Sequence, residues 1–550
     1  MDKKLILIIK SLLKAKIKTQ LDLVRAKKRL ANQHQINAPL NSDLLRVYKK
    51  LVARKIIHPN QNLEKLLLKR GIRTLSGVAV ITVLTKPYPC PGQCIYCPTE
   101  SDMPKSYLKN EPAAARAYLT KFDPFKQVKV RLEALKTNGH ATDKIELIVL
   151  GGSWSAYPKS YQTWFIKRCF DALNEKANKN LALAQRLNEK AKHRCVGLTL
   201  ETRPDFITTQ EIKRVRNLGC TRMELGVQSI YDPILKLNKR GQTVKQTIKA
   251  TKLLKEAGFK VMYHLMPNLP GSTLKKDLAM FKEIFKNPDF QPDLLKIYPC
   301  VVTKNSALYR WYQQGKFKPY SPKQLKQLII AIKRQIPYYV RITRLIRDIP
   351  AESIIAGNKI TNLRQLIAKD FKGCKCIRCR EAGHQTLNSK SEILNPKQLK
   401  NLRIKIQKYK ASDGIEYFLS YESKDRKILY AFLRLRINDD INNNFLPELR
   451  GAALIRELHT YGELIPLGQS GKIQQLGLGK KLLAEAEKIC QKQNFKKIAV
   501  ISGIGVRQYY AKLGYQLNGT YMIKNFNNEK EATGLLSLDN KPITSTLPQG

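Results

Sequence analysis

The first 75 residues show an apolar pattern that is typical of amphipathic helices. Lysines and arginines separate apolar residues that recur at helical spacing, namely Leu12, Leu13, Ile17, Leu21, Val24 and Leu30. Asn41-Ser42-Asp43 is a typical helix start and predicts a further helix over residues 44–57, before Pro59. Residues 1–75 are therefore predicted to form a small, basic helical region.

Between residues 76 and 300 the pattern changes to short β-branched and apolar runs that alternate with amphipathic stretches. The runs predicted to be strands are residues 78–83, 146–150, 195–201, 222–226, 260–265 and 294–298. The predicted helices between them include residues 128–137, 161–174, 209–218, 244–257 and 278–285. Strand–helix units in such a series predict a parallel sheet that is curled into a full or partial barrel. Catalytic groups of such folds lie at the carboxyl ends of the strands.

A second alternating region follows residue 395. Its predicted strands are residues 417–420, 428–436, 451–459 and 497–502, and a clear helix covers residues 478–493. The polar end of the chain is predicted to be a tail or an edge strand. We therefore divide the chain into a helical region (1–75), a barrel domain (76–345), a cysteine-containing connector (346–395) and a second α/β domain (396–550).

The charge of the chain is strongly one-sided. Of its 550 residues, 100 are lysine or arginine and 43 are aspartate or glutamate, which gives a formal net charge of +57. A hydrophobic content of 43% excludes intrinsic disorder of the whole chain. No apolar stretch approaches the ~20 residues that a membrane helix needs. We expect a soluble, cytoplasmic protein whose partner is a polyanion, although a solvated basic face is an alternative for residues 1–75.

Three cysteines follow the first predicted strand, in the sequence Cys90-Pro-Gly-Gln-Cys94-Ile-Tyr-Cys97. Three thiolates on one tight loop can hold three irons of a 4Fe–4S cube and leave the fourth iron open. An open iron is what S-adenosylmethionine (SAM) needs before one-electron reduction splits it. A zinc loop and incidental cysteines are the alternatives, but structural zinc sites prefer paired C-x2-C units, and no second pair lies nearby. The spacing therefore favours an iron–sulfur cluster.

Further candidate residues stand where predicted barrel strands end. Gly151 and Gly152 follow the second strand, and their bare backbone can receive the amino acid end of SAM. Glu201 ends the third strand and Gln228 ends the fourth. Charged and polar side chains gathered at one barrel end are costly unless they bind something, although each alone can be an ordinary loop residue. We therefore predict that these four residues contact the nucleotide cofactor.

A glycine-rich turn opens the predicted helix 478–493, in the sequence Gln474-Gln-Leu-Gly477-Leu-Gly479-Lys480. Free backbone N–H groups at a helix start suit a pyrophosphate, and the helix dipole adds to the attraction. The form Q-x-x-G-x-G between a strand and a helix resembles the coenzyme A loop of GNAT acetyltransferases.

Two flanking segments fit that resemblance. The preceding strand contains Glu457, Leu458, His459 and Thr460, a position that lies beside the pantetheine arm in the GNAT fold. Tyr509 and Tyr510 match the last helix of the fold, where a tyrosine hydroxyl can meet the departing thiolate. Core packing is the alternative role for either tyrosine.

A cluster loop and a coenzyme A turn on one chain resemble the catalytic subunit of Elongator, in its single-chain bacterial or archaeal form. The resemblance runs over about residues 75–524 and rests on passages at 86–98, 107–124, 143–152, 198–205, 224–231, 264–271 and 498–521. It implies a partial (βα)6 radical SAM barrel joined to a GNAT-type acetyltransferase domain, with a basic helical region before them.

The resemblance also implies the activity. The family is expected to acetylate C5 of the wobble uridine of tRNA, with the anticodon arm bound and with acetyl-CoA, SAM and a 4Fe–4S cluster. In the mechanism proposed for the family, a 5′-deoxyadenosyl radical abstracts a hydrogen from the acetyl methyl group. The carbon radical adds to C5 of uracil, and hydrolysis of the thioester leaves a carboxymethyl group.

Residue roles follow from the same resemblance. The cysteines of the first loop match the cluster ligands, and Lys144 matches a barrel lysine that contacts acetyl-CoA. Leu478, Gly479 and Lys480 match the pyrophosphate turn, where Lys480 replaces a more familiar apolar residue. Tyr510 matches a coenzyme contact, and Tyr509 matches a neighbouring tyrosine that is discussed as catalytic. Lys144, Tyr509 and Tyr510 are therefore the predicted catalytic residues.

A second cysteine cluster, Cys374-Lys-Cys376-Ile-Arg-Cys379, lies in the connector, with His384 shortly after it. Three thiolates and an imidazole suit tetrahedral zinc, and the connector of the family resembles this segment. Unmetallated thiols are the alternative, and the fourth ligand stays open. A different function is also open, since a lysine acetyltransferase acting on protein would use the GNAT half alone and keep the iron–sulfur cluster as a structural element.

Overall fold

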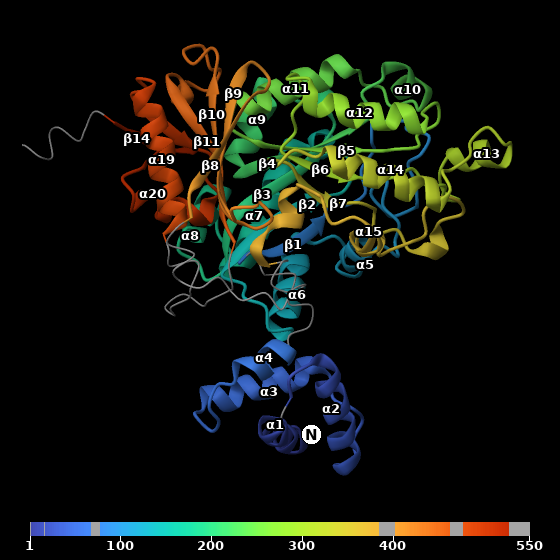
Figure 1. Ribbon diagram of the computed structural model, residues 1–550, viewed down its shortest axis with the longest axis vertical. Coiled ribbons are helices and arrows are strands. Elements are labelled where there is room, and N and C mark those ends of the chain that lie inside the picture. The colour runs from blue at the N-terminus through green and yellow to red at the C-terminus, as the bar shows by residue number, and fades with distance from the viewer. Residues whose placement is uncertain (1, 16, 68–76, 384–401, 462–476, 527–550) are drawn as a thin grey trace, which may run out of the picture.

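The computed structural model describes residues 2–15, 17–67, 77–383, 402–461 and 477–526. The N-terminal part is helical: α1 (Asp2–Lys14), α2 (Gln20–Gln33), α3 (Asn41–Ala53) and α4 (Gln61–Leu67). Leu12, Ile17 and Leu30 are buried in the apolar core of these helices, whereas Leu21 and Val24 are exposed. The helical body stands apart from the rest of the molecule, and α3 contacts α6 (Pro124–Thr137) (Figure 1).

The barrel strands form one parallel sheet, in the order of their appearance along the chain. They are β1 (Ala79–Leu84), β2 (Lys144–Leu150), β3 (Arg194–Thr202), β4 (Cys220–Gln228), β5 (Lys260–Leu265), β6 (Leu294–Ile297) and β7 (Arg341–Arg344). No pairing of β1 with β7 occurs among the described residues, so the barrel is partial. The predicted parallel barrel is confirmed, and β7 is a strand that the sequence pattern did not predict.

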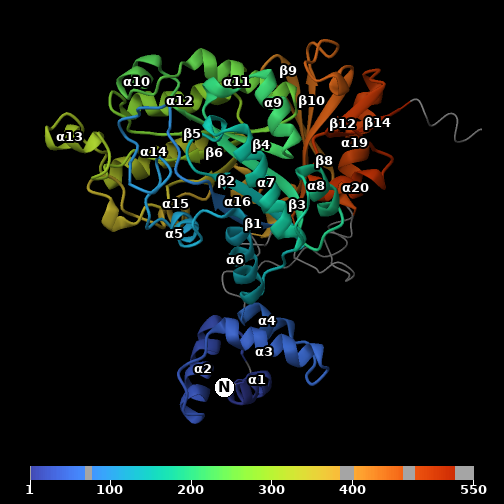
Figure 2. The ribbon, with the colours of Figure 1, turned by 180° about the vertical axis from the view of Figure 1, so that it is seen from behind.

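Helices cover the outside of this sheet (Figure 2). The larger ones are α6, α7 (Lys159–Asn174), α9 (Thr209–Asn217), α11 (Val244–Glu256), α12 (Leu274–Lys286) and α14 (Pro322–Gln335). The smaller ones are α5 (Pro112–Leu119), α8 (Leu181–Asn188), α10 (Asp232–Leu237), α13 (Leu308–Gln313), α15 (Leu363–Asp370) and α16 (Ile377–Arg380). Threonine or serine hydroxyls cap the N-termini of α9, α11, α12 and α14, where they accept hydrogen bonds from backbone N–H groups.

The second sheet has the strand order β13-β14-β12-β11-β10-β9-β8. Its elements are β8 (Ile404–Lys410), β9 (Gly414–Glu422), β10 (Leu429–Asn438), β11 (Ala452–Thr460), α19 (Leu478–Lys492), β12 (Lys497–Val500), α20 (Arg507–Ala511), β13 (Gln516–Asn518) and β14 (Tyr521–Asn525). The helix predicted over 478–493 is confirmed as α19. Strands β11 and β12 pair in parallel along residues 452–455 only, so they separate beyond that point.

The second sheet packs against the amino ends of the barrel strands. Arg456 of β11 donates to Asp293, which directly precedes β6, and also to Glu416 of β9, at 2.8 Å. A Cβ atom on Gly503 would lie 2.2 Å from the carbonyl oxygen of Val196 in β3, so only glycine fits this contact. The two domains are therefore joined by buried charges and by close backbone packing.

In the part of the chain that the structure describes, no helix is long and apolar enough to cross a bilayer. The predicted polar chain end lies outside the described residues.

Candidate active site

The cysteine loop lies between β1 and α5, at the carboxyl end of the barrel. A Cβ atom on Gly92 would lie 3.7 Å from Cys90 Sγ and 3.6 Å from Cys94 Sγ, so both sulfurs lie close to the same bare backbone. Hydrogen bonding with Cys97 and the guanidinium of Arg240 lower the pKa of the Cys94 thiol to about 5, although burial opposes them. The same hydrogen bond raises the pKa of Cys97, so the two thiols share one proton. Three cysteine sulfurs on one loop are a donor set that fits a 4Fe–4S cluster.

A cavity of about 630 Å³ is lined by this loop and by the inward side chains of the barrel strands. Gly152, Glu201 and Gln228 line it together with the cysteines, so the structure brings these predicted residues to one site. Gly151 itself packs against Thr85 next to the cavity wall, because a Cβ atom there would lie 2.0 Å from Thr85 Oγ1. Both glycines have positive φ, which other residues rarely adopt.

Several polar atoms of the cavity wall are buried and lack a hydrogen-bond partner among the described residues. They include Gln228 Oε1, Arg203 Nη1 and Arg240 Nε. Gln228 also has φ of 69°, a strained conformation for a residue with a side chain. Buried polar groups without partners are costly, so these atoms fit a polar ligand such as the amino acid and ribose parts of SAM.

A buried charged network lies on the inner wall of the barrel. Glu224 of β4 is fully buried. Its carboxylate accepts a hydrogen bond from His264 Nε2 of β5 at 2.8 Å and forms an ion pair with Lys296 of β6. Burial alone raises the pKa of Glu224, but Lys296 and His264 outweigh it and hold the pKa below its ordinary value. Glu201 lies 3.6 Å from His264 Nδ1, so the network reaches the predicted SAM contacts.

The oxygen and nitrogen atoms of Glu201, Glu224 and His264 lie within 4.8 Å of one another, a spacing that could hold a cation. However, Lys296 already forms an ion pair with Glu224, and Arg222 Nη2 lies 3.8 Å from the same carboxylate. Lys296 and Arg222 therefore already offset the charge of the Glu224 carboxylate. This cluster is better described as a polar wall for an organic ligand.

Lys144 begins β2, so it lies at the opposite end of the barrel from the cysteine loop. Its strand partner is Arg194 of β3, and a Cβ atom on Gly505 of the second domain would lie 2.6 Å from Arg194 Cβ. Lys144 therefore stands at the barrel end on which the second domain packs, and it does not line the cavity.

The predicted coenzyme A residues gather where β11 meets the start of α19. A Cβ atom on Gly479 would lie 3.5 Å from Thr460 Cγ2, 3.5 Å from Tyr509 Oη and 3.9 Å from Leu458 Cδ2. Gly477 precedes the helix with φ of 63° and leaves the N-terminal N–H groups of α19 free of any side-chain cap. Leu478 and Lys480 belong to the first turn, and Gln474 lies outside the described residues.

The other side chains of β11 point to the opposite face of the sheet, toward the barrel. Glu457 forms an ion pair with Arg434 at 2.9 Å, and His459 stacks on Phe432. Burial lowers the pKa of His459 to about 4, so its imidazole is neutral. The structure therefore brings Leu458 and Thr460 to the glycine turn, whereas Glu457 and His459 face the domain junction.

The two tyrosines of α20 differ in burial. Tyr510 is buried and packs edge-on against Tyr509, with ring centroids 5.2 Å apart. Tyr509 is partly exposed, and its hydroxyl faces Gly479 at the glycine turn. Burial raises the pKa of both hydroxyls, which keeps them protonated and able to donate. Tyr509 is thus the better placed of the two to meet a thiolate.

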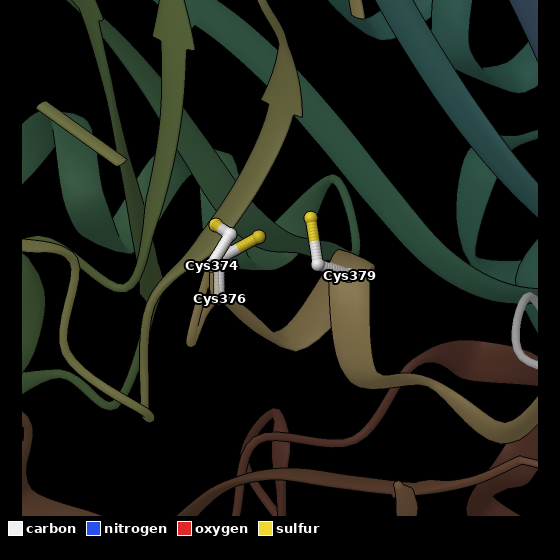
Figure 3. A group of neighbouring side chains, drawn as sticks. All are labelled: Cys374, Cys376 and Cys379. Carbon is white, nitrogen blue, oxygen red and sulfur yellow. The ribbon is translucent and has the colours of Figure 1, made fainter. Parts of the chain in front are cut away.

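The connector cysteines lie together, with the sulfurs of Cys374, Cys376 and Cys379 within 4.8 Å of one another (Figure 3). Cys374 and Cys376 are buried, and the Lys333 ammonium lies 3.8 Å from Cys379 Sγ. Three clustered thiols suit a tetrahedral zinc ion that has one further ligand. His384, the candidate for that place, lies outside the described residues.

Comparisons with known proteins agree with the two-domain arrangement. A model of the radical SAM superfamily matches residues 88–284, a radical SAM C-terminal domain matches residues 292–372, and the acetyltransferase (GNAT) family matches residues 391–515. The tRNA uridine(34) acetyltransferase of Methanocaldococcus infernus is 48% identical over 89% of this chain and 92% of its own length. The chain belongs to the tRNA uridine(34) acetyltransferase (Elp3) family.

More distant members of the Elp3 family match as well. Elongator complex protein 3 of Homo sapiens is 39% identical over 86% of this chain and 87% of its own length. The solved structure of the archaeal M. infernus Elp3 with an N-terminal deletion gives a TM-score of 0.72 at 45% identity, and the match covers 82% of this chain and 100% of that one. The resemblance inferred from the sequence is thus confirmed.

Membership of the Elp3 family makes the protein an acyltransferase enzyme with a radical SAM domain. The radical SAM domain takes a 4Fe–4S cluster and SAM, and the GNAT domain takes acetyl-CoA. The predicted fold, of a partial barrel joined to a GNAT domain, is confirmed by the same matches.

The pairing of Glu224 with His264 and Lys296 was not predicted from the sequence. Each residue lies in an apolar strand at an inward position, and Glu224 stands four residues before the predicted Gln228. The sequence offered one signal for this network, namely a charged residue within an otherwise apolar strand. The pairing itself joins residues 40 and 72 positions apart, which the strand pattern does not show.

Proposed function

We propose that this enzyme places a carboxymethyl branch on C5 of the wobble uridine of tRNA, in the cytoplasm. Its relatives include a tRNA uridine(34) acetyltransferase and Elongator complex protein 3. The observation that carries the proposal is the pairing of a cluster-binding barrel with a coenzyme A domain packed on its amino end. The net charge of +57 suits a tRNA, whose anticodon bases are unpaired and can be splayed into a pocket.

The residues of the barrel would bind and orient SAM and the base. Cys90, Cys94 and Cys97 would ligate the cluster, while Gly152 and Gln228 would hold the amino acid and ribose parts of SAM. When bound, the cluster and SAM supply the one-electron C–H activation that a weakly acidic acetyl methyl group requires.

The residues of the GNAT domain would hold acetyl-CoA. The free N–H groups at the start of α19, with Gly479 and Lys480, would bind the pyrophosphate, and the β11 backbone from Glu457 to Thr460 would bind the pantetheine. Tyr509 would donate its hydroxyl proton to the thiolate of coenzyme A when the thioester is cleaved. Lys144 begins β2 at the barrel end on which the GNAT domain packs, and it is proposed as a further contact of the coenzyme.

The experiment that tests this function is anaerobic reconstitution with iron and sulfide, followed by incubation with bulk tRNA, acetyl-CoA, SAM and a reductant. Carboxymethyluridine in the digested tRNA is the expected product. Cys97→Ser should abolish it, whereas the control Cys169→Ser, in the core on α7, should not. If acetyl-lysine appears on protein and the tRNA stays unmodified, the enzyme is instead a lysine acetyltransferase.

A second test isolates the coenzyme site. Lys144→Ala should remove tRNA-stimulated hydrolysis of acetyl-CoA, and Lys245→Ala, at an exposed position of α11, should leave it at the wild-type rate. Equal rates for the two variants would exclude Lys144 from the site.

We also propose that the connector cysteines bind structural zinc. Metal analysis of the purified protein should find zinc, and Cys376→Ser should lower both the zinc content and the thermal stability. A wild-type protein that is stable without zinc would favour unmetallated thiols.

A further inference from the structure

A row of stacked aromatic rings lies beside the cysteine loop. Tyr88 stacks on Tyr157 with ring centroids 4.8 Å apart, and Tyr157 stacks on Tyr161 at 5.3 Å. The Tyr161 ring in turn lies next to the Trp164 ring, with centroids 5.6 Å apart and an angle of 33° between the ring planes. We call these four side chains the aromatic platform. It starts two residues before Cys90 and runs onto the first turns of α7.

The centre of the platform is held rigidly. The Tyr157 hydroxyl donates to the carbonyl of Gly151 at 2.9 Å and accepts from Thr85 Oγ1 at 2.8 Å, so it joins the ends of β1 and β2. The Tyr161 hydroxyl accepts from the backbone N–H of Lys86 at 3.1 Å. The rings are thus fixed to the same strand ends that carry the cavity wall at Gly152.

Both ends of the platform are open to solvent. Trp164 is 44% exposed and Tyr88 is 37% exposed, whereas Tyr157 between them is buried. Large aromatic side chains are favourable to bury, so two exposed rings at the ends of a fixed stack indicate a surface that another molecule covers. Nothing in the structural role of Tyr157 requires the outer rings to be aromatic.

The charge around the platform indicates the class of its partner. The segments 86–89 and 157–164 contain two lysines, Lys86 and Lys159, and no acidic residue. The Lys86 ammonium lies 5.1 Å from the centroid of the Tyr161 ring. Aromatic rings that alternate with cations are the usual surface for unpaired nucleotides, because bases stack on the rings and phosphates pair with the cations.

We propose that Tyr88 and Trp164 stack with unpaired bases of the RNA that enters the barrel cavity. The site takes single-stranded RNA, and its position beside the cysteine loop assigns it to nucleotides that flank the modified one. The proposal rests on the proposed function, in that the RNA is the anticodon loop of a tRNA. A protein ligand is disfavoured because the platform offers cations and rings but no acidic group.

Tryptophan fluorescence tests the platform directly on the full-length chain. The chain has three tryptophans, and Trp311→Phe leaves Trp164 as the exposed one, because Trp154 is only 2% exposed. Titration of this variant with tRNA, and with a short single-stranded oligoribonucleotide, should quench the emission as bases stack. RNA binding without quenching would overturn the proposal.

Binding measurements separate stacking from charge. Tyr88→Leu and Trp164→Leu should each weaken RNA binding by about fivefold or more and leave the salt dependence unchanged, because no cation is removed. Tyr312→Leu is the matched control, since Tyr312 is also 37% exposed but lies on α13, outside the platform. Trp164→Phe should restore most of the affinity, which distinguishes lost stacking from lost folding.

Failure of the platform and failure of the proposed function give different results. If the wild-type enzyme modifies tRNA, and Tyr88→Leu and Trp164→Leu bind it as tightly as Tyr312→Leu does, the platform is wrong and the function stands. If the wild-type enzyme binds no tRNA, the proposed function fails and the platform with it.

Discussion

Replacing Asp293 by asparagine should weaken the junction between the barrel and the GNAT domain. Asp293 is fully buried, and its Oδ1 lies 3.1 Å from Arg456 Nη1 and 3.5 Å from Arg434 Nη1. Its Oδ2 also accepts from the backbone N–H of Val261 at 2.9 Å. An amide in this position leaves two buried guanidinium groups with one carboxylate fewer.

The expected loss in the free energy of unfolding follows from the burial of Asp293, Arg456 and Arg434. Removing one member of a buried ion pair costs about 3–5 kcal/mol, because the remaining charge is left without compensation. The lower part of that range is expected here, since Arg456 keeps Glu416 at 2.8 Å and Arg434 keeps Glu457 at 2.9 Å. About 3 kcal/mol is therefore the predicted loss.

Urea unfolding of the full-length chain measures this loss, and limited proteolysis reports whether the two domains separate. The control is Asp370→Asn, which removes an exposed pair with Lys326 whose side chains are 43% and 44% exposed. Exposed pairs contribute about 0–1 kcal/mol. If Asp293→Asn and Asp370→Asn shift the urea midpoint equally, the buried network does not hold the junction.

The pH dependence gives an independent check on Asp293. Burial raises its pKa, but Arg456, Lys255 and Arg434 outweigh burial and hold the pKa below the ordinary value. A carboxylate with a lowered folded-state pKa contributes stability above its unfolded pKa of about 3.9 and loses it as the pH falls through the folded pKa. The stability difference between wild type and Asp293→Asn should therefore be full at neutral pH and shrink in strong acid.

Three further outcomes are expected. Lys296→Met should destabilise the barrel by about 3 kcal/mol, because Glu224 stays buried without its nearest cation, while Lys282→Met at an exposed position should change the urea midpoint little. His459 has a pKa lowered to about 4 by burial, so the pH–rate profile of acetyl-CoA hydrolysis between pH 5 and 8 should keep its shape in His459→Gln. An ionisation that is present in the wild type and lost in that variant would show that His459 titrates in the working range. Deletion of the basic helical region 1–75 should weaken tRNA binding and flatten its salt dependence, and an unchanged salt slope would leave the N-terminal charge as a solvated face.

The alternation of strands and helices made most of the barrel predictable. Six strands were expected within a few residues of their observed ends, because each is an apolar run between helix starts. Strand β7 was missed because Arg341-Ile-Thr-Arg344 holds one apolar residue and is only four residues long. Strand β8 was missed because it is an edge strand, in which lysines alternate with partly exposed apolar residues.

The candidate site was predictable where chemistry is local in sequence. The cysteine loop and the glycine turn are short motifs, and the rule that functional groups lie at strand ends led to Glu201 and Gln228. The inner wall of the barrel was not predictable, because the pairing of Glu224 with His264 and Lys296 depends on which strands become neighbours. The domain junction was not predictable for the same reason, since Arg456 and Asp293 lie 163 positions apart.

In the function proposed above, one chain joins acetyl-CoA chemistry in the GNAT domain to radical chemistry in the barrel, on a tRNA base. The most direct measurement uses acetyl-CoA that carries an isotopic label in its methyl group, followed by mass spectrometry of the digested tRNA. We expect carboxymethyluridine that carries the label, formed by the wild-type enzyme and absent with either Cys97→Ser or omission of SAM. Labelled nucleoside formed equally well without SAM, or label found only in acetylated protein, would contradict it.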